Sequence, residues 1–190
     1  GLYISDEVIT GFGRVGDWFA ANLFELEPDL ITFAKGVTCG YAPLGGVVAS
    51  PRVAEPFFTQ PGLVFRHGYT SSGHSVACVA GLAVMDIIER EGLLARARHL
   101  ENELYEALAP LEDLDVVDHV RRGVGALAAI QMKVGDDDTL PARAAMACRD
   151  AGVLPRAVGG GGLQVSPPLT MTKEQVDEMA GLFEKGLKTL

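Results

Sequence analysis

Basic clusters are missing from this chain, which has 190 residues, 16 basic and 25 acidic side chains, and a formal net charge of −9. Nucleic acid and anionic membrane surfaces are therefore poor partners, because both are bound mainly through lysine and arginine. Long apolar runs are missing too: none approaches the roughly 20 residues of a membrane span, and no charged leader precedes one. We expect a soluble, cytoplasmic protein with no nucleic-acid and no membrane partner.

Cysteine is scarce, and its placement excludes two kinds of site. Cys39, Cys78 and Cys148 are far apart and odd in number, so they indicate neither a disulfide framework nor a zinc site. His67 and His74 do not have a usual metal-ligand spacing, and no cysteine or carboxylate stands near them. We expect buried free thiols, histidines with a loop role, and no metal.

Apolar residues are plentiful enough to form a sizeable core, at 48% of the chain with a mean hydropathy of +0.20. Strands are expected at residues 2–6 and 30–34, on either side of a segment with helical spacing that Pro28 ends. A mostly apolar helix from 75 to about 91 follows, and Gly92 separates it from an amphipathic helix. This order predicts a parallel α/β arrangement.

The composition changes beyond Pro110. Two strands are expected next, then a helix that ends at Gly152, and then a strand stopped by prolines. Thr172 and Gln175 fit a capping box at the start of the last helix. These features predict a second, smaller α+β part.

Two motifs raise the alternative of nucleotide binding. The segment GFGRVG at residues 11–16 matches a dinucleotide fingerprint. However, Asp6 to Thr10 separate it from the strand, and the second strand ends in Lys35 instead of an acid for the ribose. The strand LYISDE is like the magnesium-binding strand of P-loop ATPases, but the chain has no G-x-x-x-x-G-K-[ST] segment.

The stronger signal is an acid and a lysine at two strand ends. Asp6 ends the first strand and Lys35 the second, 29 residues later, and such ends form the usual ligand crevice of a parallel sheet. Pyridoxal phosphate needs this pair, because lysine forms an imine with its aldehyde and a carboxylate keeps its ring nitrogen protonated. If the strand continues, Val8 shares the face of Asp6 and Glu7 points the other way. A buried Asp6–Lys35 ion pair is the structural alternative.

Four separated motifs, DEVITGFGR, FAKG, HGYTSSGH and SPPLTMT, resemble in order and spacing the signatures of class III, omega-type pyridoxal-phosphate aminotransferases. The resemblance covers essentially the whole chain. It implies the α/β fold-type I architecture, with residues 1–95 as the C-terminal half of the large domain, containing a mostly parallel sheet. Residues 96–190 would be the small C-terminal α+β domain. It also implies a homodimer or a higher oligomer with shared active sites.

The resemblance also implies roles for six residues. Asp6 would pair with the pyridinium nitrogen, Val8 would pack on the ring, and Lys35 would carry the internal aldimine and then act as the base. Lys35 should have a lowered pKa, caused by the pyridinium charge and partial burial.

The other three roles concern phosphate and substrate. Thr70, beside the backbone of Tyr69, would bind the phosphate of the cofactor in the neighbouring subunit, unless it only caps the helix near Ser75. Arg156 would bind the carboxylate of an acid substrate with its planar fork, unless it is an ordinary surface arginine.

The implied reaction is ping-pong transamination, from an amine or omega-amino acid donor to an oxo acid such as pyruvate. An aminomutase or decarboxylase of the same fold, or a non-catalytic fragment or subunit, is the alternative. The family's N-terminal half, with its phosphate-binding loop, is not in this sequence. We therefore expect a companion chain or a larger polypeptide.

Overall fold

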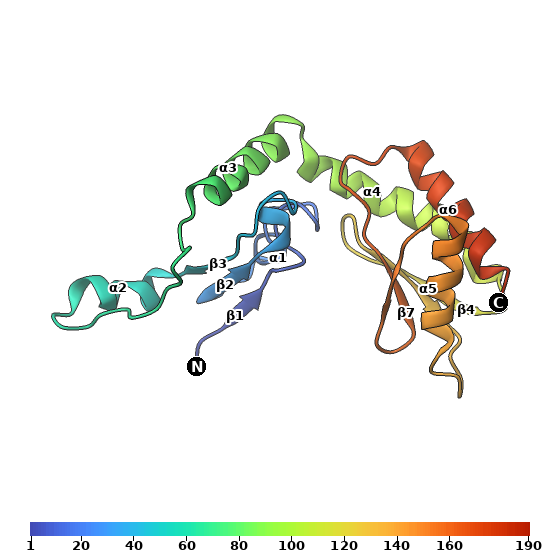
Figure 1. Ribbon diagram of the computed structural model, residues 1–190, viewed down its shortest axis with the longest axis horizontal. Coiled ribbons are helices and arrows are strands. Elements are labelled where there is room, and N and C mark those ends of the chain that lie inside the picture. Colours follow the sequence, from blue (N-terminus) through green and yellow to red (C-terminus); the bar gives the residue numbers. More distant parts are fainter. The chain divides into compact units, whose positions relative to one another are not determined.

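The computed structural model describes all 190 residues, which form two compact units, Gly1–Leu94 and Ala95–Leu190. The first unit contains a three-stranded sheet of β1 (Ile4–Asp6), β2 (Leu30–Phe33) and β3 (Gly46–Ala49), in that order (Figure 1). β1 and β2 are parallel, but β2 and β3 are antiparallel. This sheet is mixed instead of mostly parallel, because only the short 3₁₀ turn η1 (Lys35–Val37) and a loop join β2 to β3, and a parallel crossover needs a longer connection.

The helices of the first unit are α1 (Ala20–Leu23), α2 (Pro51–Thr59) and α3 (Ser75–Arg90). The helix expected before Pro28 is thus a single turn, because residues 12–18 instead form a loop closed by a hydrogen bond from Phe12 N to Trp18 O (2.7 Å). The helix expected from residue 75 is confirmed. Its N-cap is His74, whose Nδ1 accepts from Ala77 N (3.5 Å), so the interpretation of Thr70 as the cap is wrong.

The second unit contains an antiparallel sheet in the order β4-β5-β7-β6. Its strands are β4 (Val117–Arg122), β5 (Ala128–Met132), β6 (Arg156–Val158) and β7 (Gly162–Val165). The helices are α4 (Leu93–Leu108), the short η2 (Ala109–Asp113), α5 (Leu140–Ala151) and α6 (Lys173–Leu187). α5 and α6 lie side by side in Figure 1. The contact is close, because a Cβ atom added to Gly186 of α6 would lie only 2.7 Å from the Cα atom of Cys148 in α5.

Local signals at helix ends are confirmed in this unit. Gly152 ends α5 in the left-handed conformation, with φ of 115°, which glycine adopts without a steric penalty. Thr172 and Gln175 form the predicted capping box: Thr172 Oγ1 accepts from Gln175 N (3.3 Å) and Gln175 Oε1 accepts from Thr172 N (2.9 Å). Short-range hydrogen bonds therefore set these helix ends.

The core of the second unit is built on one face of α4. Ala97, Leu100, Leu104 and Leu108 recur at helical spacing, and all are buried, which confirms the amphipathic pattern. They pack in one cluster with strand residues such as Ile130. No helix of the structure combines the length and apolar character that crossing a membrane requires.

The three thiols differ in exposure. Cys148 is buried, and burial raises the pKa of its thiol to about 11; Cys78 is half-buried. Cys39 is exposed, which corrects the expectation of buried thiols. It lies in the turn after η1, with φ of 49°.

A partly buried ion pair within α4 also links this helix to the turn before α6, because its arginine donates to a carbonyl of that turn. Arg96 Nη1 and Nη2 donate to Glu103 Oε1 and Oε2, both at 2.7 Å, and Arg96 Nη2 also donates to Met171 O at 2.6 Å. The two charged side chains are 24% and 22% exposed. The hydrogen bond from Arg96 lowers the pKa of Glu103 from its usual 4.5, although desolvation by burial opposes this shift.

Replacing Arg96 by alanine is expected to lower the free energy of unfolding by about 2 kcal/mol at pH 7, because charged hydrogen bonds are lost. Because the pKa of Glu103 is lower in the folded state, the pair stabilises the fold above about pH 4.5. This stabilisation is lost as the pH falls through the pKa that Glu103 has in the folded protein. Urea unfolding at pH 7 and pH 3.5 measures both effects. Arg96→Lys keeps the positive charge but not the planar fork, so its free energy of unfolding should lie between those of Arg96→Ala and the wild type. Equal stability of Arg96→Ala and the wild type at pH 7 would contradict the prediction.

Candidate functional site

Asp6 lies at the carboxyl end of β1, where its side chain is exposed but held. Its Oδ1 accepts from Thr32 Oγ1 of β2 at 3.0 Å and from the backbone N–H of Val8 at 3.2 Å. Thr32 is also the register partner of Asp6 in the parallel pair. Both donors act on Oδ1, which leaves Oδ2 for a further donor.

Val8 does not lie on β1, because the strand ends at Asp6 and a turn begins at Val8. The strand alternation expected to place Val8 on the face of Asp6 therefore does not extend that far. Val8 is half-buried and remains next to the carboxylate through its backbone hydrogen bond. Glu7 does point the other way, as expected: it is 1% exposed, whereas Asp6 is exposed.

Lys35 is the first residue of η1, two positions after the last residue of β2, and lies at the same sheet edge as Asp6. Its φ is 44°, in the left-handed region that is uncommon for a residue with a side chain. The side chain is exposed. The alternative of a buried Asp6–Lys35 ion pair is therefore wrong. The expected partial burial of the lysine is also not supplied by this chain, because β2 and η1 leave that side chain open to solvent.

Tyr69 and Thr70 lie in the exposed segment between α2 and α3 (Figure 1). Tyr69 N donates to Ser72 Oγ at 2.8 Å, which shapes the turn before His74. Neither residue hydrogen-bonds to Asp6 or Lys35. The Tyr69 ring is 78% exposed and contacts the His67 ring edge to face, with centroids 5.5 Å apart.

Arg156 is the first residue of β6 in the second unit and is exposed. Its register partner is Gln164 of β7. It lines a cavity of about 600 Å³ whose wall also includes Thr170 and Glu178. The arginine thus faces a space within its own unit that is large enough for a small molecule.

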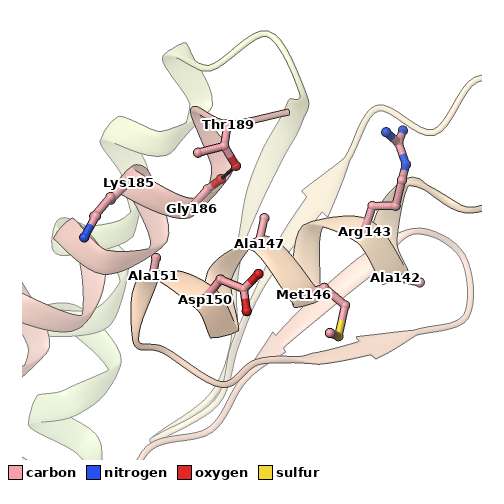
Figure 2. A pocket seen from close by; sticks show the side chains of 9 residues that line it. All are labelled: Ala142, Arg143, Met146, Ala147, Asp150, Ala151, Lys185, Gly186 and Thr189. Carbon is pink, nitrogen blue, oxygen red and sulfur yellow. Dashed lines mark hydrogen bonds between the residues drawn. The ribbon is translucent and has the colours of Figure 1, made fainter.

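Another cavity, of about 640 Å³, lies between α5 and α6 and is drawn in Figure 2. Its wall includes Arg143, Asp150 and Lys185, and Thr189 Oγ1 donates to Gly186 O at 2.7 Å at one end. None of the residues predicted to bind cofactor or substrate lines it. The described residues also contain no group of histidine, cysteine and acidic side chains arranged to hold a metal ion.

Glu7 is the residue of this region that sequence reasoning passed over. Its carboxylate accepts hydrogen bonds from Ser5 Oγ, Thr10 Oγ1, Ala20 N (2.9 Å) and Ala21 N (2.7 Å). Burial raises the pKa of Glu7, but these hydrogen bonds outweigh it, so the pKa is lowered. The available signal was a second acid directly after Asp6 and before the apolar Val8 and Ile9, because a charge that is buried at such a position requires hydrogen-bond partners.

The residues of the first unit fit pyridoxal phosphate by their chemistry. Asp6 presents a carboxylate oriented by two donors, which suits a protonated ring nitrogen. Lys35 presents an exposed primary amine at the neighbouring strand end, which suits an aldehyde. A nucleotide would need amide donors from a glycine loop at a strand end, but Gly11 and Phe12 lie against Gly36, and the Phe12 ring meets that of Phe33.

Comparisons with known proteins agree with this geometry. The family model "Aminotransferase class-III" matches residues 1–187. The chain is similar to an aminotransferase of Sinorhizobium fredii, y4uB, with 40% identity over 100% of this chain. It is also similar to a diaminobutyrate–2-oxoglutarate transaminase of Halomonas elongata, with 41% identity over 98% of the chain. It spans only 43% and 42% of the length of these relatives.

Solved structures give the same result. An amine transaminase from an uncultivated Pseudomonas species, solved in its PLP-bound form, matches 99% of this chain with a TM-score of 0.90 and 39% identity, over 44% of its own length. A thermostable (S)-enantioselective omega-transaminase from Thermomicrobium roseum matches 99% with a TM-score of 0.90 and 36% identity, over 43% of its length. The α/β units described above therefore have the fold-type I architecture of pyridoxal-phosphate transaminases, and the chain belongs to the class-III aminotransferases.

Proposed function

We propose that this chain forms the lysine-bearing part of the active site of a pyridoxal-phosphate-dependent aminotransferase. One observation carries the proposal: Asp6 and Lys35 follow neighbouring parallel strands at one sheet edge, and Asp6 is held by Thr32 and Val8. The reaction would be ping-pong transfer of an amino group from an amine or omega-amino acid to an oxo acid. The PLP-bound structure of a similar transaminase supports the choice of cofactor.

Each residue has a defined task in this proposal. When bound, pyridoxal phosphate supplies an aldehyde that condenses with amines and a ring that accepts electrons. Asp6 Oδ2 would accept a hydrogen bond from the ring N–H and would hold that proton in place by its charge. Lys35 Nζ would be the amine that condenses with the aldehyde, with release of water. Once the donor amine had replaced it, Lys35 would be the neutral amine that takes up the proton from the donor carbon. Val8 would pack beside the ring.

The substrate class is inferred from the relatives. One is a diaminobutyrate–2-oxoglutarate transaminase, and others are gamma-aminobutyrate transaminases of tomato and rice. The compounds in these names all carry a carboxylate, and each named donor also carries an amino group far from it. We propose such a donor and an oxo acid, pyruvate or 2-oxoglutarate, as acceptor. Arg156 would hold the acceptor carboxylate with two parallel N–H donors.

Partner chains are part of the proposal. The chain spans less than half of its relatives, so the remaining phosphate contacts would come from a preceding segment or a companion chain. Phe57, Phe65, His67 and Tyr69 form an exposed row of edge-to-face rings. We propose that this row contacts a second copy, where Thr70 and the Tyr69 backbone reach the neighbouring cofactor phosphate. The cytoplasmic location stays a prediction.

Replacing Arg156 by methionine in the full native polypeptide is expected to raise the KM for 2-oxoglutarate or pyruvate about ten- to a hundredfold, because a charged hydrogen-bonding pair is lost. The KM for an amine donor without a carboxylate should stay unchanged. Steady-state kinetics with each substrate varied in turn measure this split, and they also test whether an external oxo acid is required, as transfer demands.

Arg149→Met, which removes an exposed arginine of α5, is the matched control and should leave both constants unchanged. If Arg156→Met also leaves the acceptor KM unchanged, Arg156 is an ordinary surface arginine. Turnover without any oxo acid would point to an aminomutase or decarboxylase instead.

A further inference from the structure

The carboxylate of Glu7 closes the loop that follows β1. Its donors come from both ends of that loop: Thr10 lies near its start, and the amides of Ala20 and Ala21 lie at its far end. The backbone adds a further link, from Gly11 N to Glu7 O at 3.0 Å. Each carboxylate oxygen accepts one hydrogen bond from a backbone amide and one from a hydroxyl. The carboxylate is therefore fully hydrogen-bonded, and neither oxygen can be replaced by a donor group without loss of these bonds.

The loop closed by Glu7 is the support on which the Lys35 turn rests. A Cβ atom added to Gly36 would lie 3.1 Å from Phe12 Cβ and 3.3 Å from Gly11 O. The ring of Phe12 also meets that of Phe33 edge to face, with centroids 5.6 Å apart. Phe12 and Val37 belong to one buried cluster. The loop therefore contacts the chain on both sides of Lys35.

Lys35 needs such support because of its backbone. With φ of 44° it occupies a region that costs energy for a residue with a side chain, and such a conformation persists only where the surroundings impose it. The turn itself is held by long hydrogen bonds, from Val37 N to Ala34 O (3.2 Å) and from Thr38 N to Lys35 O (3.3 Å). Packing from the loop must supply the rest of the constraint.

We propose that Glu7 is a positioning residue: by closing the loop of residues 8–19 it holds the Lys35 turn, and so sets the lysine relative to the adjacent Asp6. Its effect on catalysis rests on the proposed function, whereas its effect on the Lys35 turn does not. Glu7 touches no reacting atom in this proposal and acts only through Gly11 and Phe12.

Glu7→Gln tests the proposal, because the amide group of glutamine must point its NH₂ at the Ala20 or the Ala21 N–H, where two donors then oppose each other. Hydrogen exchange of the full native polypeptide without pyridoxal phosphate should become faster in peptides covering residues 10–21 and also 33–39. Glu27→Gln, an exposed acid of the same region, should change neither. Faster exchange in residues 10–21 alone, or in neither segment, would overturn the proposal.

A rate measurement separates positioning from general destabilisation. With cofactor, Glu7→Gln should slow the donor half-reaction about tenfold or more, because small misplacement of a catalytic group is costly. Ile130→Val, in the core of the second unit, should lower the melting temperature without slowing this step. Equal rates in the two variants would refute the catalytic part.

Two further outcomes are informative. Thr10→Val removes only one of the four donors to Glu7 and should accelerate exchange in the same two segments by a smaller factor. If Glu7→Gln does not fold, Thr10→Val replaces it in the test. Exchange equal to that of the wild type would then refute the proposal. If the wild type does not bind pyridoxal phosphate at Lys35, the proposed function fails, while the exchange data still decide whether Glu7 holds the Lys35 turn.

Discussion

Substituting Lys35 by alanine is expected to abolish the visible absorbance of lysine-bound pyridoxal phosphate and to slow amino transfer at least about a thousandfold. The substitution removes both the amine that binds the aldehyde and the base that moves the substrate proton, and general base catalysis alone contributes about 10²- to 10⁴-fold. The measurement is an absorbance spectrum of the full native polypeptide with cofactor, followed by single-turnover kinetics. Because Lys35 is exposed, the fold should tolerate the change.

Lys133→Ala is the matched control, since Lys133 is also exposed but lies in the second unit, after β5. It should keep the absorbance band and the rate. Borohydride reduction of the wild type should further attach the cofactor to the peptide that contains Lys35, as detected by mass spectrometry. A visible band that survives in Lys35→Ala would show that another lysine holds the cofactor.

Replacing Asp6 by asparagine is expected to slow the donor half-reaction about a hundredfold or more, while the cofactor still binds Lys35 and keeps a visible band. Asparagine Oδ1 can still accept from Thr32 and Val8, so the local structure is retained. However, the neutral amide no longer holds the ring proton by its charge, and losing such an electrostatic group costs about 10²- to 10³-fold. Stopped-flow absorbance of the half-reaction measures the rate.

The two substitutions therefore have different signatures, because the lysine carries the covalent link and the aspartate only the charge. Asp113→Asn, which changes an exposed acid of the second unit, should leave the rate unaltered. A wild-type rate in Asp6→Asn would mean that the carboxylate does not contact the ring nitrogen. Loss of both the band and the folded-state circular dichroism would mean that Asp6 has a structural role.

Local patterns predicted the elements that depend on nearby residues. The capping box of Thr172 and Gln175 and the left-handed Gly152 are formed by hydrogen bonds that span only a few residues, so sequence spacing was sufficient. The positions of Asp6 and Lys35 at two strand ends were also readable, because largely apolar runs mark strands and the first charged residue marks where each run ends. Family membership followed from four such short motifs.

Features that depend on distant residues could not be read in this way. The shortness of α1 follows from a loop held by Glu7 across 13 and 14 residues, and the hydrogen bond from Arg96 to the carbonyl of Met171 spans 75 residues. The antiparallel direction of β3 depends on the path of the chain after Lys35. Spacing along the chain determined which residues were available for the site. Only the tertiary structure decided that Glu7 is buried next to the site and that Lys35 stays exposed, because burial and hydrogen-bond partners depend on which distant segments meet.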